Sequence, residues 1–265
     1  MILPDFVLPN RVNQLWNYSG IDSKDNNYPY PITYQYNDRG FRDDPWPANL
    51  ADKIWCFGDS FTVGIGCPRK HTWPYLLGNT INVSLDGASN YWIAKKAIRV
   101  LEEICPETIV IQWSFIWRGE NTNTELSDED RRAHFYDIQL SSEELLENFV
   151  RLVDQVDSAR QSTRIIHSFI PGWAIGNSVQ DEWDKLRGPD WPETPQGVWS
   201  PLVEKVLVEY KQDKFFKIYV ELLNRIEYVP EIVYLDRARD NFHYDLLTAQ
   251  AFVSSIRKLL DYRSR

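Results

Sequence analysis

A serine preceded by glycine and aspartate follows the first apolar run of the chain, and a serine in such a turn can act as a nucleophile. The stretch reads Gly58-Asp59-Ser60-Phe61-Thr62. A serine hydroxyl attacks a carbonyl group only if a base removes its proton and the backbone holds it exposed. A tight turn at the end of a strand provides that exposure and aims backbone N–H groups at the same point. Because Gly-Asp-Ser is also ordinary turn chemistry, the stretch has a purely structural interpretation as well.

An aspartate and a histidine near the C-terminus have the spacing of a general base and the carboxylate that orients it. They are Asp240 and His243. A spacing of three residues on a turn or short helix brings both side chains to one side. The carboxylate can then accept from Nδ1–H, which leaves Nε2 to take the proton of Ser60. A surface acid beside an unrelated histidine is the alternative, and the position just before the last predicted helix favours the catalytic interpretation.

The turn after the second apolar run, at residues 86–90, offers a backbone donor. Because Gly87 has no Cβ, a substrate can approach its N–H closely, as an oxyanion donor requires. In the structural alternative, Ser89 or Asn90 caps the helix that follows, and both interpretations can hold because they use different atoms. We also take Asp59, Asn90 and Trp113 as candidate substrate-binding residues.

From Lys53 onward, short β-rich apolar runs alternate with helical patterns. Strands are predicted at 53–57, 80–85, 108–113, 164–170 and 231–235, and helices at 90–105, 141–157, about 201–227 and about 247–262. This alternation predicts a parallel sheet covered on both faces. We therefore expect an α/β fold, a three-layer α/β/α sandwich of the flavodoxin-like sort with a central parallel five-stranded sheet. Ligands bind beyond the carboxyl ends of such strands, which is where Ser60 and Gly87 follow their strands.

The composition is that of an ordinary globular protein, 43% hydrophobic and 25% charged. A net charge of -9 argues against sequence-independent nucleic-acid binding, which needs clustered Lys and Arg. The cysteines Cys56, Cys67 and Cys105 have no metal-ligand spacing and are expected to be free thiols in a reduced compartment. We see no signal peptide and no apolar run near the roughly 18 residues of a membrane span, and expect a cytoplasmic protein.

Taken together, these stretches resemble the SGNH/GDSL hydrolase superfamily. Residues 54–64 resemble its first block, 82–90 its second and 240–243 its last, while 37–42 resemble a lead-in found in some members. The resemblance implies Ser60 as nucleophile, His243 as base and Asp240 as its orienter. It also implies the N–H groups of Ser60 and Gly87 as oxyanion donors, an acyl-enzyme intermediate, and no metal or organic cofactor.

One block departs from the family pattern. After the third strand the family shows Gly-x-Asn-Asp, whose Asn donates to the oxyanion, but here the chain reads Ile-Gln-Trp-Ser-Phe at 111–115. Ser114 is the nearest substitute by position, with Gln112 and the indole N–H of Trp113 as alternatives. Because loss of one oxyanion donor typically lowers kcat about 10²–10³-fold, either another group fills the place or activity is low.

The resemblance implies an esterase acting on a small-molecule or glycan ester, with O-acetyl groups on a carbohydrate as the preferred substrate. Tryptophan rings stack well on sugars, and residues 175–200 hold Trp183, Trp191 and Trp199, although packing of an inserted segment also accounts for them. An acyltransferase with the same triad and a catalytically decayed binding or structural module are the alternatives. The oligomeric state stays open.

For the domain organisation we expect an irregular N-terminal arm at 1–52, packed on a hydrolase domain at 53–265 with insertions near 115–140 and 175–200. Arg118 and Glu120, beyond the third strand, are expected to form an exposed ion pair, with lining of the mouth of the site as the alternative, and His167 is expected to be structural. Trp55 and Trp92 are expected to face the core.

Overall fold

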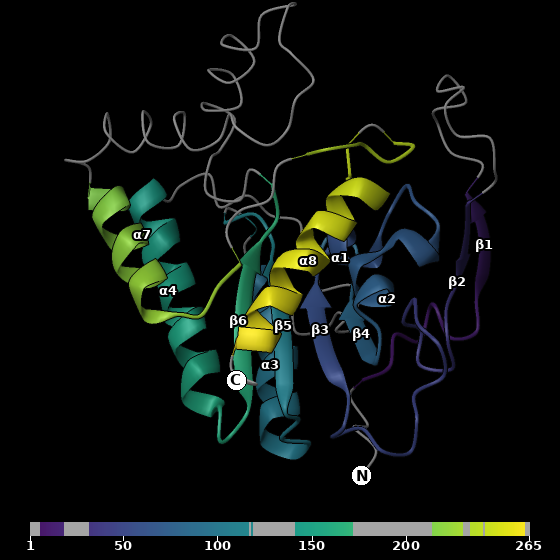
Figure 1. Cartoon of the computed structure of the whole chain (residues 1–265), viewed down its shortest axis with the longest axis horizontal. Coiled ribbons are helices and arrows are strands. Elements are labelled where there is room, and N and C mark those ends of the chain that lie inside the picture. Colours follow the sequence, from purple (N-terminus) through teal and green to yellow (C-terminus); the bar gives the residue numbers. More distant parts are fainter. Residues whose placement is uncertain are drawn as a thin grey trace, which may run out of the picture.

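A computed structural model describes residues 6–18, 32–116, 118, 141–171, 214–229, 234–240 and 242–262 of the chain. Its centre is a parallel sheet (Figure 1) of β3 (Ile54–Gly58), β4 (Thr80–Ser84), β5 (Thr108–Trp113) and β6 (Arg164–Phe169). The order across the sheet is β4-β3-β5-β6. All residues of β5 are buried, as expected for a parallel strand covered on both faces. The predicted α/β class, with a parallel sheet and flanking helices, is confirmed.

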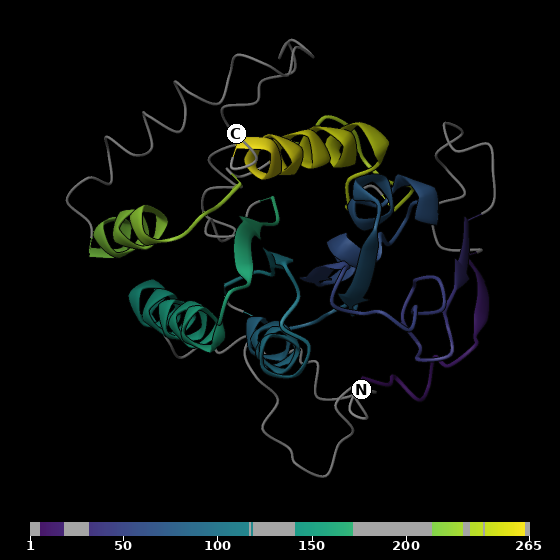
Figure 2. The same ribbon diagram turned by 60° about the horizontal axis from the view of Figure 1, so that its bottom comes forward.

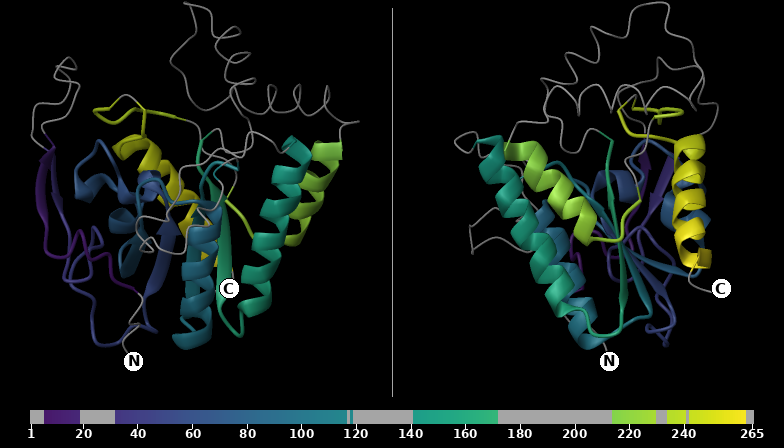
Figure 3. Two further views of the ribbon diagram at one scale, coloured as in Figure 1. Left: turned by 180° about the vertical axis from the view of Figure 1, so that it is seen from behind. Right: turned by 60° about the vertical axis from the view of Figure 1, so that its left-hand side comes forward.

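Helices cover both faces of this sheet (Figure 2). On one face lie α3 (Asn90–Glu103) and α4 (Ser142–Ala159), which pack against each other. On the other lie α2 (Trp73–Leu77) and α8 (Leu246–Tyr262), also in mutual contact. Helix α7 (Lys214–Arg225) packs beside α4, as the views in Figure 3 also show.

The predicted fifth strand at 231–235 is not confirmed. Its first three residues lie outside the described part of the chain, and Tyr234 and Leu235 are not in a strand. Instead, the chain pairs with the free edge of β6 earlier, through a parallel bridge between Tyr228 and His167. Among the described residues the sheet therefore has four strands. The bridge of Tyr228 to β6 comes three residues after the end of α7 at Arg225.

Two serines explain where the central helices begin. The Ser89 side chain accepts from the backbone N–H of Trp92 at 3.2 Å and caps α3. Ser141 and Glu144 form a reciprocal capping box at the start of α4. Because Ser89 is the cap, the side chain of Asn90 is available for other contacts. Of the helix predicted at 201–227, only the part after residue 213 is described.

The N-terminal arm contains regular structure where the sequence predicted none. Strands β1 (Leu15–Tyr18) and β2 (Ile32–Gln35) pair as an antiparallel ladder. These strands are too short for their alternation to stand out in the sequence. Phe6 and Phe41 of the arm are buried in the same core cluster as Trp55 of β3.

Several expectations concern residues that the structure does not describe. Of residues 115–140 only Phe115, Ile116 and Arg118 are described, and none of 175–200 with its tryptophans is. Trp55 and Trp92 are buried, which confirms that they face the core. Within the described ranges, no helix has both the length and the apolar character needed to cross a bilayer.

Candidate active site

Ser60 is the first residue of α1 (Ser60–Val63), one residue beyond Asp59 and the carboxyl end of β3. The Asp59 carboxylate caps this short helix by accepting from the N–H of Phe61 at 3.0 Å. Gly58 has to be glycine here, because a Cβ would lie 2.0 Å from Oγ1 of Thr62. Among the described residues, neither the hydroxyl nor the N–H of Ser60 has a hydrogen-bond partner. The turn thus presents a serine whose hydroxyl and N–H are available.

Asp240 and His243 form the predicted pair. Oδ2 of Asp240 lies 2.5 Å from Nδ1 of His243, and Oδ1 accepts from the N–H groups of Phe242 and His243 at 3.0 Å each. Burial by itself raises the pKa of Asp240, but these hydrogen bonds outweigh it and hold the pKa below its ordinary value. Asp240 is therefore an ionised acceptor that sets the orientation of the imidazole.

The imidazole of His243 lies beside the residue that follows Ser60. The ring centroids of His243 and Phe61 are 4.6 Å apart. Nε2 of His243 is buried and has no hydrogen-bond partner, so the Ser60–His243 hydrogen bond is not formed in this structure. The Asp240–His243 pair thus lies beside the turn of Ser60, with Nε2 of His243 free of hydrogen bonds.

Gly87 lies in the turn between β4 and α3, with a φ of 73°. That left-handed conformation suits glycine. The N–H of Leu85 donates to the carbonyl of Gly58 at 3.2 Å, which ties this turn to the turn of Ser60. No hydrogen bond within the described part of the chain engages the N–H of Gly87. Two unengaged backbone donors thus lie on adjoining turns.

Ser114, the nearest substitute for the absent asparagine, has its hydroxyl committed elsewhere. Its Oγ donates to Oδ2 of Asp59 at 2.6 Å, and the side chain is fully buried. Its backbone N–H donates to Oδ1 of Asn90 at 2.8 Å. In this structure Ser114 offers no donor to a substrate and instead anchors the carboxylate next to Ser60.

The two alternative donors are also engaged or enclosed. The indole N–H of Trp113 donates to Nδ1 of His167 at 3.0 Å, in the interior. Oε1 of Gln112 accepts from Thr62 at 2.9 Å and from the hydroxyl of Tyr244 at 3.1 Å. Nε2 of Gln112 has no partner, but the residue is fully buried. His167 is thus a buried strand residue, which agrees with the structural role expected for it.

Asn90 and Asp59 have internal partners in place of the expected substrate contacts. Nδ2 of Asn90 donates to the carbonyls of Ser114 and Phe115 at 3.0 and 3.2 Å. Together with its bond to the N–H of Ser114, this side chain clips the segment after β5 to the start of α3. Asp59 has no exposed surface. Both residues therefore hold the backbone of the site in place through internal hydrogen bonds.

Arg118 does not form the exposed ion pair that the sequence led us to expect. Its predicted partner Glu120 lies outside the described residues, and the guanidinium instead pairs with Oδ2 of the buried Asp59 at 2.8 Å. The same Nη1 donates to Oγ of Ser114 at 2.9 Å and to the carbonyl of Ala88 at 3.4 Å. Its place shortly after the third strand was the only signal in the sequence.

A second histidine–carboxylate pair lies nearby and was also missed. Nδ1 of His71, in the short helix η1 (Arg69–His71), lies 2.8 Å from Oδ1 of Asp245. Burial raises the pKa of Asp245 to about 6, and burial followed by the charge of Lys70 lowers the pKa of His71. The pair ties η1 to the segment just before α8, two residues after His243.

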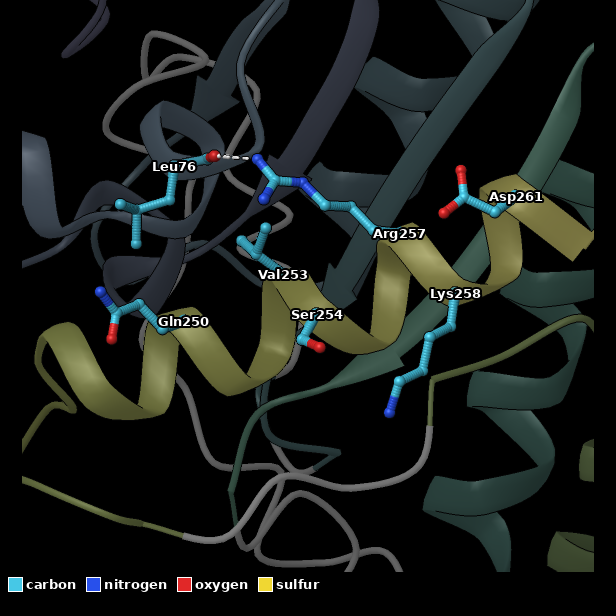
Figure 4. Close-up of a pocket in the computed structure, with 7 residues that line it drawn as sticks. All are labelled: Leu76, Gln250, Val253, Ser254, Arg257, Lys258 and Asp261. Atoms are coloured by element: carbon cyan, nitrogen blue, oxygen red, sulfur yellow. Dashed lines mark hydrogen bonds between the residues drawn. The ribbon is translucent and has the colours of Figure 1, made fainter.

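Two cavities among the described residues are lined by none of these site residues. One, of about 410 Å³, lies along α8 where Arg257 reaches the carbonyl of Leu76 at 2.8 Å (Figure 4). The other, of about 370 Å³, is lined by polar residues that include Asp43 and Arg69. Within the described ranges, no group of three or more His, Cys, Asp or Glu side chains is placed to hold a metal ion.

No model of a known protein family matches the chain, and no curated protein matches it. Among solved structures, 22 chains match. One is TesA, with 12% identity and a TM-score of 0.42 over 78% of this chain and 97% of that one.

Two more of the similar structures are a bacterial esterase and a bacterial lipase. An esterase, EstA from Pseudoalteromonas sp., has 13% identity and a TM-score of 0.45 over 81% of this chain and 100% of that one. A GDSL-like lipase from Bacteroides thetaiotaomicron has 11% identity and a TM-score of 0.40 over 83% and 92%.

Proposed function

We propose that this chain is a serine esterase in which Ser60 is the nucleophile, His243 the general base and Asp240 the residue that orients the base. One observation carries the proposal. The imidazole is held through Nδ1 by an ionised carboxylate, while its buried Nε2 has no partner and the ring contacts the residue next to Ser60. A histidine arranged in this way can accept a proton at Nε2.

In the proposed reaction, Oγ of Ser60 attacks the carbonyl carbon of the ester while Nε2 of His243 takes the hydroxyl proton. The N–H groups of Ser60 and Gly87 stabilise the negative charge that develops on the carbonyl oxygen. Collapse of the tetrahedral intermediate expels the alcohol, which receives its proton from His243. A water molecule, deprotonated by His243, then attacks the acyl-enzyme. Collapse of the second tetrahedral intermediate releases the acid, and His243 returns the proton to Oγ of Ser60.

Asp240 stays ionised throughout, because its hydrogen bonds favour the charged form. It stabilises the imidazolium that forms in each half-reaction. The hydrogen bond between Ser60 and His243 is expected to form when substrate binds, since catalytic hydrogen bonds are often unmade in the unliganded enzyme.

For the substrate we propose a carboxylic ester with a small acyl group, with an O-acetylated carbohydrate as the preferred case. The tryptophan-rich segment at 175–200 is the sequence feature behind this preference. Release of acetate from acetylated oligosaccharides, compared with release from p-nitrophenyl acetate, tests it. Transfer of the acetyl group to an added sugar in place of release would identify an acyltransferase.

A fluorophosphonate probe and a p-nitrophenyl acetate assay test the proposal, with Ser60→Ala as the matched control. We expect wild-type protein to be labelled and to turn over the ester, and the variant to do neither. Absence of both labelling and turnover in wild-type protein would overturn the esterase proposal and favour a binding module on the same fold.

A further inference from the structure

The guanidinium of Arg118 lies between the two turns that carry the proposed oxyanion donors. Its Nη1 contacts Asp59, the residue before Ser60, and the carbonyl of Ala88, the residue after Gly87. Each contact is thus one residue from a proposed donor. From this placement we infer that Arg118 supplies the third oxyanion donor, in place of the asparagine that the third block lacks. The inference rests on the proposed esterase function.

Arg118 has donors to spare for this role. An arginine side chain carries five N–H donors in a rigid fork, and the hydrogen bonds of this guanidinium to the described residues use Nη1 alone. Within the described part of the chain, Nη2 and Nε have no partner. The side chain is 21% exposed, whereas Asp59 beneath it has no exposed surface. Nη1 is therefore anchored to buried groups, while part of the side chain stays exposed.

The anchor makes the donor rigid before any substrate binds. Asp59 and Ser114 hold Nη1 at 2.8 and 2.9 Å, and the ring of Phe115 lies 5.1 Å from the guanidinium carbon. Oxyanion donors are effective because they need no reorganisation during the reaction. A charged donor also forms hydrogen bonds about twice as strong as those of a neutral amide. Arg118 therefore combines the fixed position and the charge that this role requires.

The other groups near the third block are less suited. The hydroxyl of Ser114 is donated to Asp59, and the indole N–H of Trp113 to His167. Gln112 retains an uncommitted amide but is completely enclosed. Of the residues described between β5 and α4, Arg118 alone combines a partly exposed side chain with side-chain N–H groups that lack partners.

The experiment must separate a donor from a residue that only neutralises the buried Asp59. Replacing Arg118 by methionine removes both functions, because it leaves a buried carboxylate without its counter-charge. The double variant Asp59→Asn/Arg118→Met removes that charge as well, while the asparagine amide keeps an oxygen that can cap α1. For both variants and wild type, kcat and KM for p-nitrophenyl acetate are measured beside Tm.

We expect Arg118→Met to lower kcat about 10²–10³-fold with KM changed less than about threefold, and to lower Tm. In the double variant Tm should recover while kcat stays low. Recovery of kcat together with Tm would overturn the inference, and so would a wild-type kcat in Arg118→Met. Wild-type protein that fluorophosphonate does not label through Ser60 overturns the esterase proposal itself and this inference with it, which distinguishes the two failures.

Discussion

Gly66 lies directly against the carboxylate of Asp240. A Cβ built on Gly66 would stand 3.0 Å from Cγ and Oδ1 of Asp240 and 2.9 Å from Cβ of Ala238. The N–H of Arg239 also donates to the carbonyl of Gly66 at 3.0 Å. The loop that follows the α1 turn is thus fitted to the loop that carries His243, and the absence of a side chain at Gly66 allows this fit.

We expect Gly66→Ala to displace Asp240 and so to misplace His243. Ester hydrolysis should fall at least about tenfold in kcat, because small displacements of catalytic groups cost large factors in rate. Gly78→Ala is the matched control. Gly78 has a φ of 76°, close to the 79° of Gly66, but a Cβ there meets nothing within 4 Å. Equal losses of kcat in the two variants would show that backbone strain, and not the contact with Asp240, is responsible.

Replacing Asp240 by asparagine tests the orienting carboxylate. The asparagine amide can donate from its N–H₂ group to Nδ1 of His243. The imidazole then carries its proton on Nε2, the nitrogen that has to be unprotonated to act as the base. We expect kcat to fall by about 10⁴, as in serine hydrolases whose orienting aspartate is replaced, with fluorophosphonate labelling slowed in parallel. A decrease below about tenfold would contradict the assigned role of Asp240.

Asn90 is expected to matter for stability. Its truncation to alanine leaves the buried N–H of Ser114 without its acceptor, which costs about 1–3 kcal/mol. Urea unfolding of Asn90→Ala measures this loss in the free energy of unfolding. Asn49→Ala, at an exposed asparagine, is the control and should change it by less than about 0.5 kcal/mol. Similar midpoints for the two variants would contradict the clip assigned to Asn90.

Asp43 predicts a pH dependence of stability. Burial raises its pKa from 3.8 to about 6, against hydrogen bonding from the N–H of Asn82 and the charge of Arg69. Arg69 is bound at 2.7 Å to Asp44, which limits how far its charge lowers the pKa of Asp43. Because the folded state holds this proton more tightly than the unfolded state, the group stabilises the fold below about pH 4. That contribution is lost as the pH rises through about 6.

Asp43→Asn removes this titration and should therefore gain stability relative to wild type as the pH rises. The difference in unfolding free energy between variant and wild type should shift by on the order of 2–3 kcal/mol between about pH 4 and pH 7. Urea unfolding at several pH values across that range measures it. A difference that does not change with pH would show that the carboxyl group titrates normally in the folded protein.

The regular elements of the domain were predictable because their signals are local. Apolar runs placed β3 to β6 to within about a residue at each end, and Ser141 at the start of α4 was recognisable next to its helical pattern. The predicted fifth strand at 231–235 stays unconfirmed, because only Tyr234 and Leu235 of it are described and neither is in a strand. The pairing of Tyr228 with β6 depends on the position in space at which α7 ends, and no local sequence pattern predicts that pairing.

The sequence by itself determined the alternation of strands and helices from β3 to β6, and with it the turn of Ser60 and the three-residue spacing that lets Asp240 reach His243. Only the tertiary structure decided which polar groups remain available to a substrate. Ser114 and Trp113 are committed to Asp59 and His167, residues more than fifty positions away along the chain. The physical reason is that a buried polar group must find a hydrogen-bond partner, and long-range packing, which no short stretch of sequence encodes, selects that partner.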